Sequence, residues 1–130
     1  MLDANVAIAA LNGVRGVRER LATVAADDVA LPVVALAELT FGAYKSRKRE
    51  ENLQRLQSLR GAIPVIPLTD GIVDLYGSTR ASLEARGVVK SDFDLLIACT
   101  ALDANATLVT NDGSLLDGSI DGLRAENWLP

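Results

Sequence analysis

Short apolar, β-prone runs alternate along the chain with longer stretches of helical pattern and composition. The runs expected to form strands are Met1–Asp3, Val29–Pro32, Ile63–Leu68, Thr107–Thr110 and Leu123–Trp128. The stretches expected to form helices are 5–12, 14–26, 34–45, 47–60, 71–86 and 92–104. Short strands separated by helices are typical of a parallel sheet with helices on both faces. The pattern therefore predicts an α/β fold with a short, mostly parallel central sheet.

Glycines and prolines indicate where several of these elements end. Gly13 separates the first two helices, and Gly87 closes the helix expected over 71–86. Two prolines within Ile63–Leu68 predict a strand at the edge of the sheet. The chain shows no internal repeat, low-complexity segment or domain boundary, so residues 1–130 are expected to form one domain.

Four acidic residues lie on or beside apolar segments: Asp3, Glu38, Asp94 and Asp112. Asp3 and Asp112 each fall just past a predicted strand, and the other two lie on helices that flank the strands. Parallel sheets place active sites beyond the carboxyl ends of their strands, so we expect the four acids to meet at one edge. Carboxylates are rarely buried unless they are paired or bind a metal. The set therefore predicts one shared site that holds a cation.

Three of the four acids also have a structural interpretation, whereas Glu38 is harder to explain in this way because it interrupts an otherwise apolar run. Asp94 or Asp92 can serve as the N-cap of the helix expected over 92–104, and Asp112 with Gly113 resembles an ordinary turn. Asp3 is compatible with an exposed residue near the terminus. Taken singly, each interpretation is as good as a functional one. Taken together with the placement at strand ends, the four acids are better explained by a site.

The composition narrows the chemistry that such a site can perform. Hydrophobic residues make up 49% of the chain and aromatic residues 4%, which predicts a core of Ala, Val, Leu and Ile. The absence of histidine excludes Ser-His-Asp and Cys-His catalysis and histidine zinc sites. Cys99, the single cysteine, lies in an apolar helical pattern and is expected to be a buried hydrophobe. No run approaches the roughly 18 apolar residues that span a bilayer, so a cytoplasmic protein without membrane contact is expected.

A site built from carboxylates suits a hard cation such as Mg²⁺ or Mn²⁺. Such a cation lowers the pKa of a bound water and neutralises charge on a phosphate, whereas the bare carboxylates repel one another. We therefore expect metal-dependent phosphodiester hydrolysis. Thr110, Asn111 and Asn5 are expected to support the site by holding a carboxylate or a water. Capping and turn formation are equally good explanations for these three residues.

Basic residues concentrate between positions 45 and 60, although the net charge of the chain is −4. Six of the 13 basic residues lie there: Lys45, Arg47, Lys48, Arg49, Arg55 and Arg60. Such a stretch is commonly a solvated helix face. Beside an acidic metal site it is also compatible with holding nucleic acid, and the candidate contacts are Lys45, Arg47, Lys48 and Arg49.

Four segments, in this order, resemble PIN-domain proteins: Met1–Asn5, Ala37–Gly42, Ser91–Ala98 and Leu108–Asp112. The ending Gly122–Trp128 is similar to that of the VapC-type toxins within this family. The resemblance covers essentially the whole chain, and the ordered set is more specific than any single motif.

This resemblance implies a three-layer α/β/α PIN-like fold and an endoribonuclease that depends on Mg²⁺ or Mn²⁺. Asp3, Glu38, Asp94 and Asp112 match the acidic positions of the family, with Asp3, Asp94 and Asp112 as the implied metal ligands. Thr110 matches its hydroxyl position. The resemblance also implies a homodimer and a small cognate antitoxin protein whose tail enters the active-site groove. Operator DNA is expected to be bound only through that antitoxin.

The chain departs from the family pattern at Ala4, where a hydroxyl residue is common. In addition, Asp92 lies two residues before Asp94, and the family block favours Asp94 as the ligand, which leaves Asp92 as a supporting group or a cap. The alternative functions are a catalytically inactive PIN-like binding module and a nuclease for another single-stranded nucleic acid, such as single-stranded DNA. An inactive copy is expected to lose one or more of the four acids, and all four are present.

Overall fold

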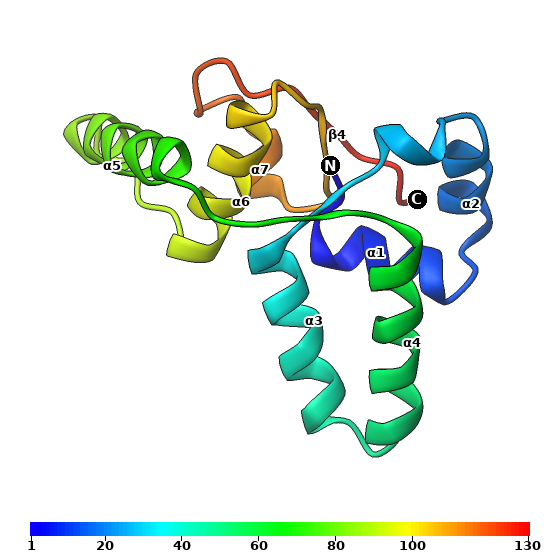
Figure 1. The fold of residues 1–130 in the computed structure, drawn as a ribbon. Helices are drawn as coiled ribbons and strands as arrows, with labels where there is room; N and C mark the ends of the chain where they lie inside the picture. Colours follow the sequence, from blue (N-terminus) through cyan, green and yellow to red (C-terminus); the bar gives the residue numbers. More distant parts are fainter.

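A computed structural model describes residues 1–130 and has α/β architecture (Figure 1). The strands are β1 (Leu31–Pro32), β2 (Val65–Ile66), β3 (Leu108–Val109) and β4 (Ala125–Glu126). The helices are α1 (Ala4–Leu11), α2 (Arg15–Ala22), α3 (Val33–Lys45), α4 (Arg49–Ala62), α5 (Asp70–Ala85), α6 (Asp92–Asp103) and α7 (Gly113–Leu116), with a 3₁₀ turn η1 (Ala26–Asp28).

All strand pairs are parallel, and they form two short ladders joined by the N-terminal segment. β1 pairs with β2, and β3 pairs with β4. The Leu2 amide donates to the Ala30 carbonyl at 2.9 Å, and the Asp3 amide donates to the Val109 carbonyl at 2.9 Å. Residues 1–3 therefore lie between the two ladders. The parallel sheet predicted from the sequence is confirmed, and so is the edge position of β2, which pairs with β1 alone.

Helices pack on both sides of these strands (Figure 1). The buried core consists almost entirely of Ala, Val, Leu and Ile side chains, as the composition predicts. α3 and α4 form a hairpin that projects from the rest of the molecule, while α5 packs against α6 (Figure 1). No helix combines the length and the apolar character needed to cross a bilayer.

Two backbone turns occur where glycine was expected to interrupt a helix. Gly13 (φ 75°) separates α1 from α2, and Gly87 (φ 76°) follows α5, both in the left-handed region that favours glycine. The helix expected over 14–26 was wrong at its end, since α2 stops at Ala22. There the Thr23 and Val24 amides donate to carbonyls three residues back, which tightens and ends the last turn.

One helix was not predicted from the sequence: α7, which has four residues and begins directly after Asp112. Its sequence, Gly-Ser-Leu-Leu, is too short to show helical periodicity and begins with a turn-forming glycine. Since isolated helices of this length are unstable, α7 depends on its contacts with the rest of the fold.

Candidate active site

Three of the four predicted acids lie at helix N-termini. Asp3 caps α1, and its Oδ1 accepts from the Ala4 amide at 2.7 Å. Asp112 caps α7, and its Oδ1 accepts from the Ser114 amide at 2.9 Å. Asp94 lies in the first turn of α6. The positive end of each helix dipole offsets part of the repulsion among these carboxylates. Capping by Asp3 and Asp112 was not predicted from the sequence, and the interpretation of Asp3 as an exposed residue was wrong, since Asp3 is buried.

Thr110 joins two of these acids directly. Its hydroxyl donates to Asp3 Oδ2 at 2.6 Å and accepts from the Asp112 amide at 3.1 Å. Thr110 is fully buried and Asp3 is 6% exposed, so solvent does not compete for these hydrogen bonds. Thr110 directly follows β3, and Asp3 follows Leu2, which pairs with Val109. The Thr110 hydroxyl and the caps of α1 and α7 therefore lie at one edge of the sheet, as expected for parallel strands.

Glu38 lies on α3 and carries the least satisfied oxygen in the protein. Its Oε1 is sealed from solvent and has no hydrogen-bond partner. Burial raises the pKa of the Glu38 carboxyl above its usual range, and the negative charges of the other three acids raise this pKa further. The four predicted carboxylates thus act on one another electrostatically, although they are separated by many residues in the sequence.

Asp94 is half-buried and lies beside Ser114 of α7. Burial raises the pKa of its carboxyl, and the charges of Asp112 and Asp3 add to this effect. Hydrogen bonds from Ser91 and Ser114 oppose it. The helix N-cap here is Ser91, whose hydroxyl accepts from the Asp94 amide at 3.2 Å, so neither aspartate takes the capping role.

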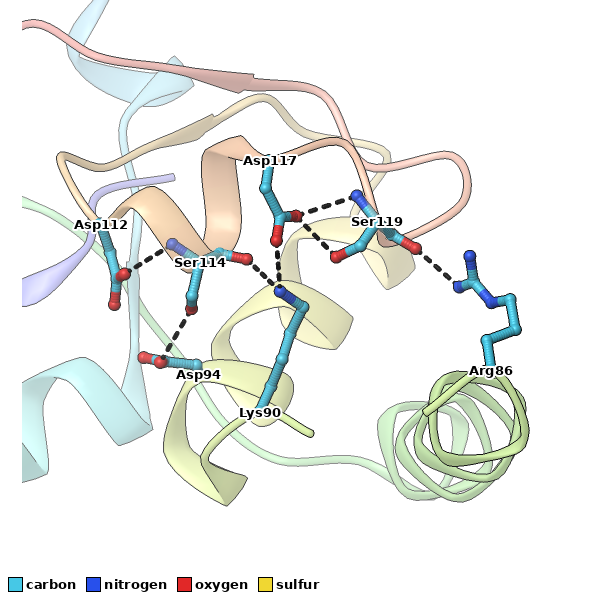
Figure 2. Close-up of polar contacts among 7 residues, drawn as sticks. All are labelled: Arg86, Lys90, Asp94, Asp112, Ser114, Asp117 and Ser119. Atoms are coloured by element: carbon cyan, nitrogen blue, oxygen red, sulfur yellow. Dashed lines mark hydrogen bonds and ion pairs between the residues drawn. The ribbon is translucent and has the colours of Figure 1, made fainter. Parts of the chain in front are cut away.

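Ser114 contacts two of the acids and was not identified from the sequence. Its hydroxyl lies 3.4 Å from Asp94 Oδ2, and its amide donates to Asp112 (Figure 2). The one sequence signal that points to it is the spacing from Asp112, since an N-cap side chain accepts from the amide two or three residues later. Ser114 therefore links α6 to α7 at the site.

Asp92 lies in the same helical turn as Asp94 but contacts α5. Its Oδ1 accepts from the Tyr76 hydroxyl at 2.7 Å and from Arg80 Nη1 at 2.9 Å. Two residues correspond to about 200° around a helix, so neighbouring acids at this spacing project in nearly opposite directions. The structure thus gives Asp92 partners outside the carboxylate group.

The predicted supporting amides lie at the exposed rim. Asn5 Nδ2 donates to Asn111 Oδ1 at 3.2 Å, which links α1 to the loop after β3. Neither amide contacts a carboxylate of the group through a hydrogen bond. Of the predicted supporting residues, only Thr110 bonds directly to the site acids.

The four candidate nucleic-acid contacts are exposed at the end of the α3–α4 hairpin (Figure 1). Two of them have intramolecular partners. The Lys45 ammonium lies 5.8 Å from the centre of the Phe41 ring, and Arg49 Nε donates to the Tyr44 carbonyl at 2.9 Å. Lys45 follows Glu38 by seven residues on the same helix, a rise of about 10 Å. The basic tip is therefore connected to the acidic site by one side of α3.

A groove extends from Glu38 between α1, α3 and α4. Its apolar lining is Ile8, Leu11, Leu39, Ala43 and Leu56. Arg55 also lines it, and Arg55 Nη2 donates to Asn12 Oδ1 at 2.9 Å.

The chemistry of these residues fits a hard divalent cation, although the acids do not form a closed coordination shell. No three Asp, Glu or Cys side chains come close enough together to hold a metal ion between them. The donors are nevertheless all oxygens, and the unpartnered Glu38 oxygen requires a positive partner or a hydrogen-bond donor.

Comparison with known proteins agrees with the resemblance seen in the sequence. The family model of the PIN domain matches residues 1–118. Ribonuclease VapC2 of Rickettsia felis is 35% identical over 130 residues, which cover 98% of this chain and 96% of the relative. The tRNA(fMet)-specific endonuclease VapC of Shigella flexneri is 32% identical over 129 residues, again with 98% and 96% covered.

The fold agrees equally well with that of a solved complex. The crystal structure of VapBC2 from Rickettsia felis bound to a DNA fragment from their promoter matches with a TM-score of 0.89 and 33% identity, over 99% of this chain and 98% of that chain. The predicted α/β PIN-like fold is thereby confirmed. The chain belongs to the PIN-domain family and, within it, to the VapC-type ribonuclease toxins of toxin–antitoxin systems.

Proposed function

We propose that this chain is a Mg²⁺- or Mn²⁺-dependent endoribonuclease and that residues 1–130 act as one PIN-like domain. The observation that carries the proposal is the mutual electrostatic influence of Asp3, Glu38, Asp94 and Asp112, with one Glu38 oxygen buried and unpartnered. Charged groups that are held together at such a cost in free energy are typical of functional sites.

In this proposal Asp3, Asp94 and Asp112 hold the cation. A bound divalent cation would supply a water of lowered pKa and would neutralise charge on the phosphate. Thr110 keeps Asp3 and the start of α7 in register, since it bonds to the Asp3 carboxylate and to the Asp112 amide. Glu38, whose pKa is raised, is suited to accept the proton of the attacking water.

RNA is expected to contact the basic tip, which comprises Lys45, Arg47, Lys48 and Arg49. Substituting glutamine for Arg47 and Lys48 together should raise the KM for RNA several-fold and leave kcat nearly unchanged, because phosphate contacts hold the substrate without touching the reacting atoms. The slope of log KM against log salt should fall by about 2, one for each lost phosphate contact.

Arg15 and Arg18 provide a matched control for this change. They lie on α2, away from the hairpin, and Arg15 pairs with Glu19 at 2.8 Å. Glutamine at both positions alters the net charge equally and should leave KM and its salt dependence as in the wild type. A similar effect of both pairs would assign the change to net charge and would remove the tip from the RNA surface.

The groove beside Glu38 is suited to an antitoxin. We propose that the tail of a small cognate antitoxin binds the apolar wall of this groove and reaches the acidic site, as the resemblance implies. Support comes from the Rickettsia felis relative, which was crystallised as a VapBC2 complex on promoter DNA. From the family resemblance we also propose that this chain forms a homodimer and contacts operator DNA only through the antitoxin.

The direct test is cleavage of RNA and of single-stranded DNA of the same sequence in the presence of Mg²⁺ or Mn²⁺. Because the Shigella relative is specific for tRNA(fMet), initiator tRNA is the first RNA to use, with total RNA as a second substrate. We expect internal cuts in RNA and none in DNA. Cleavage of DNA alone would identify the other nuclease function, and no cleavage of any substrate with either metal would indicate an inactive binding module.

A further inference from the structure

Lys90 is a buried cation that the proposed mechanism does not use. It lies two residues before the start of α6, and its side chain is only 2% exposed. Burial of a lysine ammonium costs free energy unless it is paired and hydrogen-bonded. The buried ammonium of Lys90 is therefore stabilised by the groups that it contacts.

Both partners of Lys90 belong to α7 and the residue that follows it. Its Nζ donates to the Ser114 carbonyl and lies 3.0 Å from Asp117 Oδ2 (Figure 2). Asp117 is itself fixed, because its Oδ1 accepts from the Ser119 amide at 2.9 Å and the Ser119 hydroxyl at 2.6 Å. Lys90 thus attaches a four-residue helix, unstable by itself, to the start of α6.

The Ser114 peptide unit connects this attachment to the active site. On one side Ser114 bonds to Lys90 through its carbonyl, and on the other its amide donates to Asp112 while its hydroxyl reaches Asp94 (Figure 2). Lys90 touches neither acid. The causes of the raised Asp94 pKa also do not include the charge of Lys90.

We propose that Lys90 is a positioning residue that sets the spacing of Asp94 and Asp112 through Ser114. The inference rests on the proposed function, since it concerns the same carboxylates. Loss of Lys90 would free Ser114 to shift, and small displacements of catalytic groups lower turnover strongly. Substrate contacts at the α3–α4 tip would be unaffected.

The test is Lys90→Met, which keeps much of the side-chain length and removes the charge. The remaining partner, Asp117, is 46% exposed, so no unpaired charge is left buried, and the thermal midpoint should fall by only a few degrees. The kcat for RNA should fall about 10- to 100-fold with KM nearly unchanged. The Kd for Mn²⁺ alone, measured by calorimetry without RNA, should weaken about 10-fold, as is typical when partners of metal ligands are lost.

Arg86→Met is the matched control. Arg86 Nη2 donates to the Ser119 carbonyl at 2.8 Å, so this cation holds the same loop but does not contact Ser114 (Figure 2). Its kcat and Mn²⁺ affinity should equal those of the wild type. Equal losses in both variants would show that general anchoring of the loop matters, and would overturn the specific role of Lys90.

The outcomes separate this inference from the proposed function. If the wild type cleaves RNA and Lys90→Met retains its kcat and Mn²⁺ affinity, the inference is wrong and the proposed function stands. If the wild type cleaves nothing, the proposed function fails and the Mn²⁺ affinities decide the inference alone. If Lys90→Met does not fold, Lys90→Gln and Ser114→Ala take its place: wild-type kcat and Mn²⁺ affinity in Lys90→Gln would overturn the role of Lys90, and the same result in Ser114→Ala would refute the link from Ser114 to Asp94.

Discussion

Replacing Asp94 with asparagine is expected to lower the kcat for RNA cleavage on the order of 10²–10³-fold, the range seen when one preorganised charged or polar group is removed from an active site. The amide has nearly the same shape but cannot supply the negative charge that holds a cation. The carboxyl is half-buried and is subject to repulsion from Asp112 and Asp3. Its neutralisation should therefore leave the folding stability equal or higher, and the lost activity will not reflect unfolding.

Asp92→Asn is the control for this substitution. It removes the same charge two residues away, where the carboxylate contacts Tyr76 and Arg80 on α5. We expect kcat to stay within a few-fold of the wild type and the thermal midpoint to decrease slightly, since this ion pair is largely exposed. Measured rates in the opposite order would assign the metal to Asp92 and would contradict the site proposed above.

The convergence of the acids could be predicted from the sequence because it depends on simple rules. Asp3 and the segment Thr110–Asp112 follow short apolar strands, and parallel strands end at one edge of a sheet. Glu38 was detectable because it is the one charged residue in the otherwise apolar run Val33–Leu39. The apolar pattern of the sequence was sufficient to predict where these residues meet, because their positions depend on local pattern and on the common direction of the parallel strands.

The parts of the site that escaped prediction depend on contacts distant in the chain. α7 has too few residues for a periodic signal, so Ser114 was not identified. Lys90 lies 24 residues from Ser114, and nothing in the local sequence indicates that its side chain is buried. The sequence analysis favoured Asp94 over Asp92 as the metal ligand, but the partners of Asp92 lie on α5, and no local pattern predicts these contacts.

Chelation of divalent metal is expected to abolish RNA cleavage, and addition of Mg²⁺ or Mn²⁺ should restore it. The same cation should raise the thermal midpoint, because it binds the folded state and removes repulsion among the four carboxylates. At a metal concentration of about 100 times Kd the gain is roughly 2.7 kcal/mol. Calorimetric scans with and without EDTA measure this change. Full activity in EDTA would remove the metal from the mechanism.

The metal-free protein should also show a characteristic dependence of stability on pH. The pKa values of Glu38 and Asp94 are raised in the folded state, so these two groups bind more protons in the folded chain than in the unfolded chain above about pH 4. Stability should therefore fall as pH rises from there through the folded pKa values, and Mg²⁺ should stabilise most above them. Asp117 has the opposite effect, because its pKa is lowered to about 2, mainly by hydrogen bonds from Ser119.

Glu38→Gln isolates the contribution of the acidic site from that of Asp117 and the other carboxylates. Without metal, this variant should lose less stability than the wild type between about pH 4 and pH 8, because it has no proton to release from position 38. The difference between the two curves removes every group that both proteins share. Parallel curves would mean that Glu38 titrates alike in the folded and unfolded chains, and the electrostatic coupling on which the proposed site rests would be absent. If the two curves differ without metal and Mg²⁺ makes this difference smaller, the cation binds close enough to the four carboxylates to offset their repulsion.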